Sequence, residues 1–329
     1  MSTTHIPTFV APTSDDLADL HRYLPAELRG ESTIITRIAA GMSGAGVYRV
    51  RAHDTEFVLK ITAQDERLDV WRAKTSVQQA AAGVGIAPQV IHVDENGRAV
   101  LSELIADQSF GARMGNPSTR EVSINALGNM LRQLHALPIP TNSTPVDPVA
   151  FLAKLRNTIP ADFPLPAYAR QIIEGMCAET PPHDKCARVL SHNDVNPTNL
   201  VFDGTRVLLL DWQTAAPNSP YYDLAAFAMF FRLDEVASRK LLSAHGSASV
   251  DTLPAVFRYF KRFSAVMSGA AALHMARLRG HTGGDVAVGG TPSLGDIYQQ
   301  MRAGSFDIGS VDGQWMFGLA LVKEGMIAP

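Results

Sequence analysis

The chain has 329 residues, 46% of them hydrophobic, and is long enough to fill two domains, each with its own core. Its 29 basic and 32 acidic residues give a net charge of −3, which argues against a partner such as nucleic acid or an anionic membrane. No apolar run approaches a membrane span, and Met1–Val10 lacks the basic and apolar regions of a signal peptide. The two cysteines show no metal-ligand spacing and are expected to be reduced thiols. We therefore expect a cytoplasmic protein.

The first third of the chain predicts a small β-sheet preceded by a helix. Ser14, followed by two acids, is typical of a helix start. Runs of β-branched and aromatic residues between turn signals predict strands and one helix rich in Ala and Gln. The strands are expected at 34–38, 47–50, 56–61, 90–93 and 98–101, and the helix at 68–83.

A glycine-rich turn joins the first two of these strands, and its candidate nucleotide contacts are Gly41, Ser43, Gly44, Ala45 and Gly46. Small residues let backbone N–H groups approach phosphates without side-chain clash. The turn opens no helix, as a Rossmann motif would, and lacks the Gly-Lys-Ser/Thr ending of a P-loop. By itself such a turn is more often a plain hairpin than a phosphate loop.

A strand lysine strengthens the phosphate interpretation. Lys60 alternates with Val58 on the strand that follows the loop, where an ammonium group could bind the α- and β-phosphates of a nucleotide. Glu103 lies in the connector that follows the last strand, within the expected lobe boundary at 102–108, so it is a candidate nucleotide contact. A solvated strand end is the simpler interpretation of its side chain.

The chain is organised around the stretch 191–212, which contains the spacing H-x-D-x-x-x-x-N at His192, Asp194 and Asn199. A short apolar hairpin follows and ends in Asp211, twelve positions after Asn199. Phosphoryl transfer from Mg-ATP needs one carboxylate to orient and deprotonate the hydroxyl, and an amide with a second carboxylate to hold Mg²⁺. We expect Asp194 in the first role, with Asn199 and Asp211 as metal ligands. An ordinary Asx-rich hairpin is the competing explanation.

Helices are expected through most of the remaining chain. Asp223 is expected to cap the helix that begins beside it, and His135 is expected to pack or cap rather than react. Kinases carry a glutamate on the helix after the lysine strand, but no glutamate occurs between Arg67 and Val90. Three possibilities stay open for Lys60: a pair with Glu66, a pair with Asp69, or a pair only with Asp211 and phosphates.

These motifs together resemble the aminoglycoside phosphotransferase and choline kinase superfamily over about residues 34–231. The segment from Gly41 to Tyr48 is similar to the nucleotide loop of aminoglycoside phosphotransferases, and 85–88 with 192–194 is more similar to bacterial choline kinases. The resemblance implies an α+β, bilobal protein-kinase-like fold. Residues 1–105 would form the nucleotide-binding lobe, with an N-terminal extension at 1–30, and 106–329 the helical catalytic and substrate-binding lobe.

The resemblance implies a kinase that transfers the γ-phosphate of ATP, with Mg²⁺, to a hydroxyl of a small and cationic acceptor. Acids between Asp234 and Asp312 and the aromatic Trp315 are candidates for holding that acceptor. The alternative is a non-catalytic nucleotide-binding pseudokinase, which the missing helix glutamate favours. A protein kinase is disfavoured because D-F-G and A-P-E are absent from the sequence. The expected assembly is a monomer or a homodimer.

Overall fold

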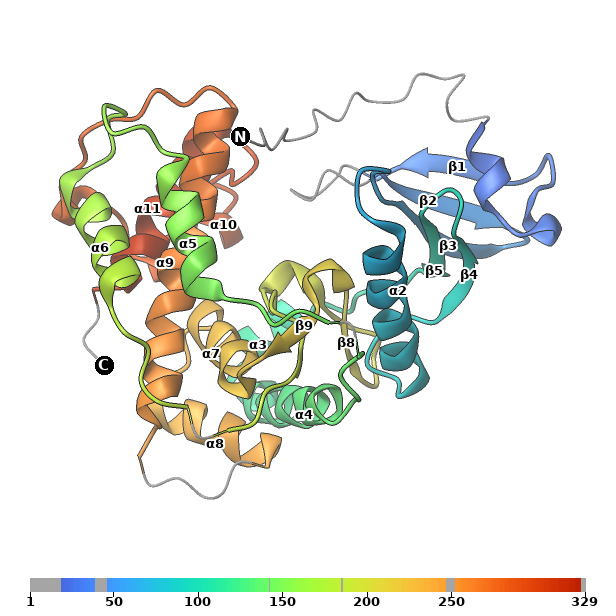
Figure 1. Ribbon diagram of the computed structural model, residues 1–329, viewed down its shortest axis with the longest axis horizontal. Coiled ribbons are helices and arrows are strands. Elements are labelled where there is room, and N and C mark those ends of the chain that lie inside the picture. The colour runs from blue at the N-terminus through green and yellow to red at the C-terminus, as the bar shows by residue number, and fades with distance from the viewer. Residues whose placement is uncertain (1–18, 39–45, 142, 185, 247–251, 327–329) are drawn as a thin grey trace. The chain divides into compact units, whose positions relative to one another are not determined.

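The computed structural model forms two compact units and describes residues 19–38, 46–141, 143–184, 186–246 and 252–326 (Figure 1). The first unit takes in 1–112, 140–143 and 198–215, and the second takes in 113–139, 144–197 and 216–329. An antiparallel sheet dominates the first unit and helices dominate the second, so the predicted α+β class is confirmed. The predicted domain boundary near residue 105 stays a prediction.

The first unit is built on a five-stranded antiparallel sheet in the order β1-β2-β3-β5-β4. All five strands lie where the sequence predicts them. They are β1 (Ile34–Arg37), β2 (Gly46–Ala52), β3 (Thr55–Ile61), β4 (Val90–Asp94) and β5 (Ala99–Glu103). The predicted helix start at Ser14 lies outside the described residues, and the chain continues as the 3-10 turns η1 (Leu20–Tyr23) and η2 (Ala26–Leu28).

The two faces of this sheet have different partners because side chains alternate along a strand. On one face, Tyr48, Val50 and Leu59 are buried against leucines of the N-terminal turns. On the other face, Val58 and Lys60 of β3 point into a cavity. Leu59 is 0% exposed, so the alternation anchors β3 in the core and turns its lysine toward that cavity.

Three further pieces complete the first unit. Helix α2 (Leu68–Gly83) is the predicted Ala- and Gln-rich helix. Strands β7 (Leu200–Phe202) and β8 (Val207–Leu209) form the predicted apolar hairpin, which turns at Asp203-Gly204. The 3-10 turn η4 (Trp212–Thr214) follows β8 and packs against α2.

The second unit surrounds a long helix, α9 (Ala255–Leu278), drawn in orange in Figure 1. Most of its residues are buried, and α5, α6, α7 and α11 pack on it. The other described helices and strands are α3 (Phe110–Gly115, at the boundary of the units), α4 (Pro117–His135), α5 (Pro148–Asn157), α6 (Ala167–Ala178), β6 (Val189–Ser191), η3 (Pro197–Asn199), β9 (Ala216–Asn218), α7 (Pro220–Phe230), α8 (Glu235–His245), η5 (Val288–Gly290), α10 (Leu294–Arg302) and α11 (Val311–Glu324).

Cys177 and Cys186 are both free thiols, as the sequence analysis expected. Within the described ranges, every helix is too short or too polar to cross a membrane.

Glycines allow α9 and α11 to pack closely. A Cβ added at Gly269 of α9 would lie 2.7 Å from Val322 Cγ2 and 2.8 Å from the backbone oxygen of Gly318, both on α11. A Cβ at Gly318 would in turn lie 3.0 Å from the backbone oxygen of Gly269. Because backbone atoms cannot rotate aside, the two helices would have to separate to admit a methyl group.

Gly269→Ala is therefore expected to destabilise the protein by about 1–3 kcal/mol through overpacking, although alanine favours a helix. The matched control is Gly175→Ala in α6, because nothing lies within 4 Å of a Cβ there. That control should raise stability by about 0.5–1 kcal/mol. Urea denaturation measures both values. Equal midpoints for the two variants would show that the close approach is not a constraint.

Candidate active site

Lys60 and Asp211 form an ion pair in the first unit. Lys60 lies on β3 between Val47 of β2 and Val100 of β5, and its Nζ lies 2.7 Å from Asp211 Oδ1. The two side chains are 23% and 30% exposed, so solvent screens the pair only in part. Of the three partners that the sequence leaves open for Lys60, the ion pair in the structure is with Asp211.

The two acids considered as replacements for the helix glutamate have other partners. Glu66 pairs with Lys74 of α2, and Asp69 pairs with Arg67.

The backbone at Asp211 directs its carboxylate. Asp211 has φ 61° and ψ 73°, a left-handed conformation that non-glycine residues rarely adopt, although Asp and Asn adopt it more readily than most. The residues on both sides are fixed, since Leu210 N–H donates to Asn199 O and Trp212 Nε1–H donates to Leu209 O. Such a conformation costs on the order of 1 kcal/mol and persists where the surroundings impose it.

Asn199 and Asp211 lie at the same end of the β7–β8 hairpin. Leu200 pairs with Leu209, which places Asn199 just before one strand and Asp211 just after the other. Asn199 is 8% exposed, and both residues line the cavity.

An amide oxygen and a carboxylate are the hard donors that Mg²⁺ prefers. Among the described residues no three His, Cys, Asp or Glu side chains form a metal cluster, so Mg²⁺ bound here would complete its shell with phosphates and water.

The cavity has a volume of about 490 Å³ and lies entirely within the first unit. Its lining contains both apolar and charged side chains. The apolar part includes Val47, Val58, Pro88, Val100, Leu104 and Leu210, and the charged part includes Lys60, Glu66, Lys74, Glu103 and Asp211.

The other residues that the sequence predicts as nucleotide contacts lie partly inside and partly outside the described residues. Glu103 lines the cavity, and its Oε2 lies 3.5 Å from the backbone nitrogen of Gln89. Gly41, Ser43, Gly44 and Ala45 lie outside the described residues. Gly46 begins β2, where an added Cβ would come within 2.8 Å of the Tyr48 ring. The functional roles of all these residues stay predictions.

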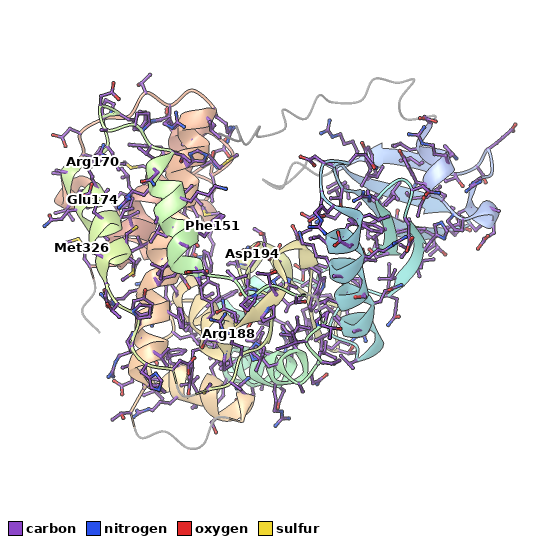
Figure 2. The ribbon with its side chains drawn as sticks, viewed as in Figure 1. Phe151, Arg170, Glu174, Arg188, Asp194 and Met326 are labelled. Atoms are coloured by element: carbon purple, nitrogen blue, oxygen red, sulfur yellow. The ribbon has the colours of Figure 1, made fainter. Side chains whose placement is uncertain are left out.

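Asp194 lies in the loop after β6, in the second unit (Figure 2). Its Oδ1 accepts a hydrogen bond from Asn196 Nδ2 at 2.8 Å. Asn193, with φ 65°, fixes the loop because its side chain donates to Ala216 O and accepts from Asn218 Nδ2. The loop that carries the predicted base is therefore held to β9 by side-chain amides.

Asp223 anchors this loop from α7, and the prediction that it caps a helix is wrong. Ser219 is the cap, because its Oγ accepts from Tyr221 N–H and Pro220 follows it at the first helical position. The Asp223 carboxylate is 0% exposed and accepts from the backbone N–H groups of His192 and Asn193, each at 2.8 Å. Asp223 therefore fixes the backbone just before Asp194.

Two histidines extend this anchor, and the sequence predicted only a packing or capping role for His135 and none for His245. His135 Nε2 lies 3.1 Å from Asp223 Oδ2, and its Nδ1 lies 2.8 Å from His245 Nε2. Because carboxylate oxygens accept, His135 donates from Nε2 to Asp223, and the tautomers of the two rings set the direction of the His135–His245 hydrogen bond. Burial, together with the neighbouring His135 and Arg132, lowers the pKa of His245 to about 4, and Asp223 opposes this shift. His245 is therefore neutral at pH 7.

Residues 34–256 match the phosphotransferase enzyme family (APH). The chain belongs to this family. It is a small-molecule phosphotransferase, and the superfamily predicted from the sequence is confirmed. A comparison with curated proteins found no match.

Solved structures similar to this chain are kinases and phosphotransferases. A choline/ethanolamine kinase family protein from Mesorhizobium loti matches at 17% identity and TM-score 0.59, covering 96% of this chain and 95% of that one. LicA, crystallised with AMP, matches at 13% identity and TM-score 0.56, covering 94% and 96%. An aminoglycoside-3′-phosphotransferase of type VIII matches at 21% identity and TM-score 0.53, covering 76% and 98%. At these identities the likeness shows the fold, and the predicted kinase-like fold is confirmed.

The lowered pKa of His245 predicts how the stability of the protein depends on pH. The unfolded chain binds a proton at His245 near its ordinary pKa of about 6.5, whereas the folded chain resists it until about pH 4. Stability should therefore fall as the pH drops from 6.5 toward 4. His245→Gln removes this titration, so its urea midpoint should drop less between pH 7 and pH 5 than that of the wild type.

The matched control is His183→Gln, at an exposed histidine in the same unit. This variant should lose stability in parallel with the wild type. If His245→Gln lost as much stability as the wild type between pH 7 and pH 5, His245 would not titrate in this range.

Proposed function

We propose that this phosphotransferase moves the γ-phosphate of ATP to a hydroxyl of a small, cationic molecule. The observation that carries the proposal is the Lys60–Asp211 pair beside Asn199, in a cavity whose wall is part apolar and part charged. Such a wall suits a purine ring and a polyphosphate, and the AMP bound in the similar LicA structure supports a nucleotide there. Glu103 and residues 41–46 are assigned to nucleotide contacts.

The residues divide the chemistry among them. Asp194 accepts the proton of the acceptor hydroxyl while that oxygen bonds to the γ-phosphorus, and the bond to the bridging oxygen of ADP breaks. Lys60 binds phosphate oxygens. Asn199 and Asp211 hold Mg²⁺, which neutralises phosphate charge when bound. The proposal places the nucleotide site in the first unit of a cytoplasmic enzyme.

The acceptor is assigned to the second unit, which carries Asp194. Several carboxylates considered for a cationic acceptor have structural partners instead. Asp234 caps α8, Asp296 forms a capping box with Ser293, and Asp307 accepts from Gly309 N–H. Trp315 is 4% exposed and stacks on His281 with ring centroids 4.3 Å apart, so its ring offers no open face.

An exposed aromatic ring lies elsewhere in this unit. Phe151 of α5 is 57% exposed. In the view of Figure 2, it lies on the same side of α5 as Asp194, the side turned away from α6. A phenyl ring can bind an ammonium group through a cation–π contact. We therefore assign Phe151 to contact with the cationic part of the acceptor.

Asp194→Asn tests the proposal. Loss of a general base is expected to lower kcat by about 10²- to 10⁴-fold, while the affinity for ATP stays unchanged because Asp194 does not hold the nucleotide. ADP release measures kcat and calorimetry measures ATP binding. The matched control is Asp162→Asn, at an exposed carboxylate of the same unit, which should retain full activity. A wild-type kcat in Asp194→Asn would refute the role.

A non-catalytic nucleotide-binding protein is the second candidate, favoured by the missing glutamate on α2. Wild-type protein should be screened for ADP release with amino alcohols, aminoglycosides, macrolides and sugars. Turnover with any acceptor excludes this candidate. ATP binding without turnover across the panel would favour it over the enzyme.

A further inference from the structure

One face of α2 lines the same cavity as Lys60. Trp71, Lys74, Thr75 and Gln78 line the cavity, and their spacing places them on a single stripe of the helix. Lys74 is the only charged member of this stripe. Its ammonium pairs with the carboxylate of Glu66, which also lines the cavity. The two side chains are 31% and 20% exposed.

This arrangement reverses the charge that the kinase pattern requires. In kinases, a glutamate on this helix pairs with the strand lysine and holds it against the phosphates. Here the helix presents an ammonium group, so two cations, Lys60 and Lys74, face one cavity. Two like charges in a partly desolvated space repel unless each has a counterion. Asp211 and Glu66 are those counterions.

We propose that Lys74 is a second phosphate-binding cation of this cavity, and that Glu66 holds it until a nucleotide enters. The inference rests on the proposed nucleotide site and deepens it. Lysine suits the exchange, because its flexible stem carries three donors that can turn from one anion to another. The carboxylate of Glu66 and the polyphosphate compete for the same ammonium group. Lys74 therefore favours ATP over AMP, which lacks the outer phosphates.

This competition predicts opposite effects for the two partners. Lys74→Gln removes the cation and should weaken ATP binding. Glu66→Gln removes the competitor and a negative charge from the wall, and should strengthen ATP binding. If the Lys74–Glu66 pair only held the start of α2 in place, the two substitutions would have the same effect. Either one would break the ion pair, and both would weaken ATP binding.

Calorimetry on the full-length protein, with ATP and with AMP, each with Mg²⁺ and with EDTA, tests the inference. Lys74→Gln is expected to raise the Kd for ATP by about tenfold and to leave the Kd for AMP unchanged. Glu66→Gln is expected to lower the Kd for ATP in both buffers. The matched control is Lys240→Gln, which breaks an exposed ion pair with Glu121 in the second unit and should change neither Kd.

Three results would overturn the inference and leave the nucleotide site standing. They are an unchanged ATP affinity in Lys74→Gln, an equal loss for ATP and AMP in that variant, and weaker ATP binding in Glu66→Gln. The last of these, seen only with Mg²⁺, would assign Glu66 to the metal. Failure of the wild-type protein to bind either nucleotide would refute the proposed function and this inference together.

Discussion

The ion pair between Lys60 and Asp211 is the interaction on which the first unit depends. It joins β3 of the sheet to the turn after β8, two segments separated by 151 positions in the chain. The lysine reaches it because β3 alternates, with Leu59 buried in the core and Lys60 on the cavity face. The carboxylate reaches it because Asp211 adopts a left-handed conformation between two fixed neighbours. One contact thus joins two segments of the chain that both line the cavity.

Much of this unit follows from sequence patterns of short range. Alternation over 56–61 predicts both the strand and the face on which Lys60 lies. An apolar hairpin that turns at Asp203-Gly204 predicts that Asn199 and Asp211 end up at the same edge. Such features are encoded within about ten residues of one another, which is the range over which periodicity and turn chemistry act.

Features that depend on distant partners could not be predicted in the same way. Asp223 is an acid at the start of a helix, and local chemistry makes a cap its simplest role. Its actual partners are loop amides some 30 positions away and a histidine 88 positions away. Nothing local distinguishes His135 and His245 from ordinary helix-end histidines. Conversely, the caps at Asp234 and Ser293 could have been predicted, since each stands directly before a helix and Asp296 follows Ser293 at the spacing of a capping box.

The glutamate missing from α2 illustrates how the absence of one side chain changes the ion pairs of a whole site. Without a glutamate on the helix, Lys60 takes Asp211 as its counterion, and Asp211 is also the proposed metal ligand. On the proposed function, a metal held by Asp211 would take the place of the Lys60 ammonium, and Lys60 would then be available to phosphates. Lys74 and Glu66 repeat this arrangement across the cavity. On the two proposals made above, both ion pairs would exchange partners when metal and polyphosphate enter, and nucleotide binding would be an exchange of counterions rather than the filling of a preformed positive site.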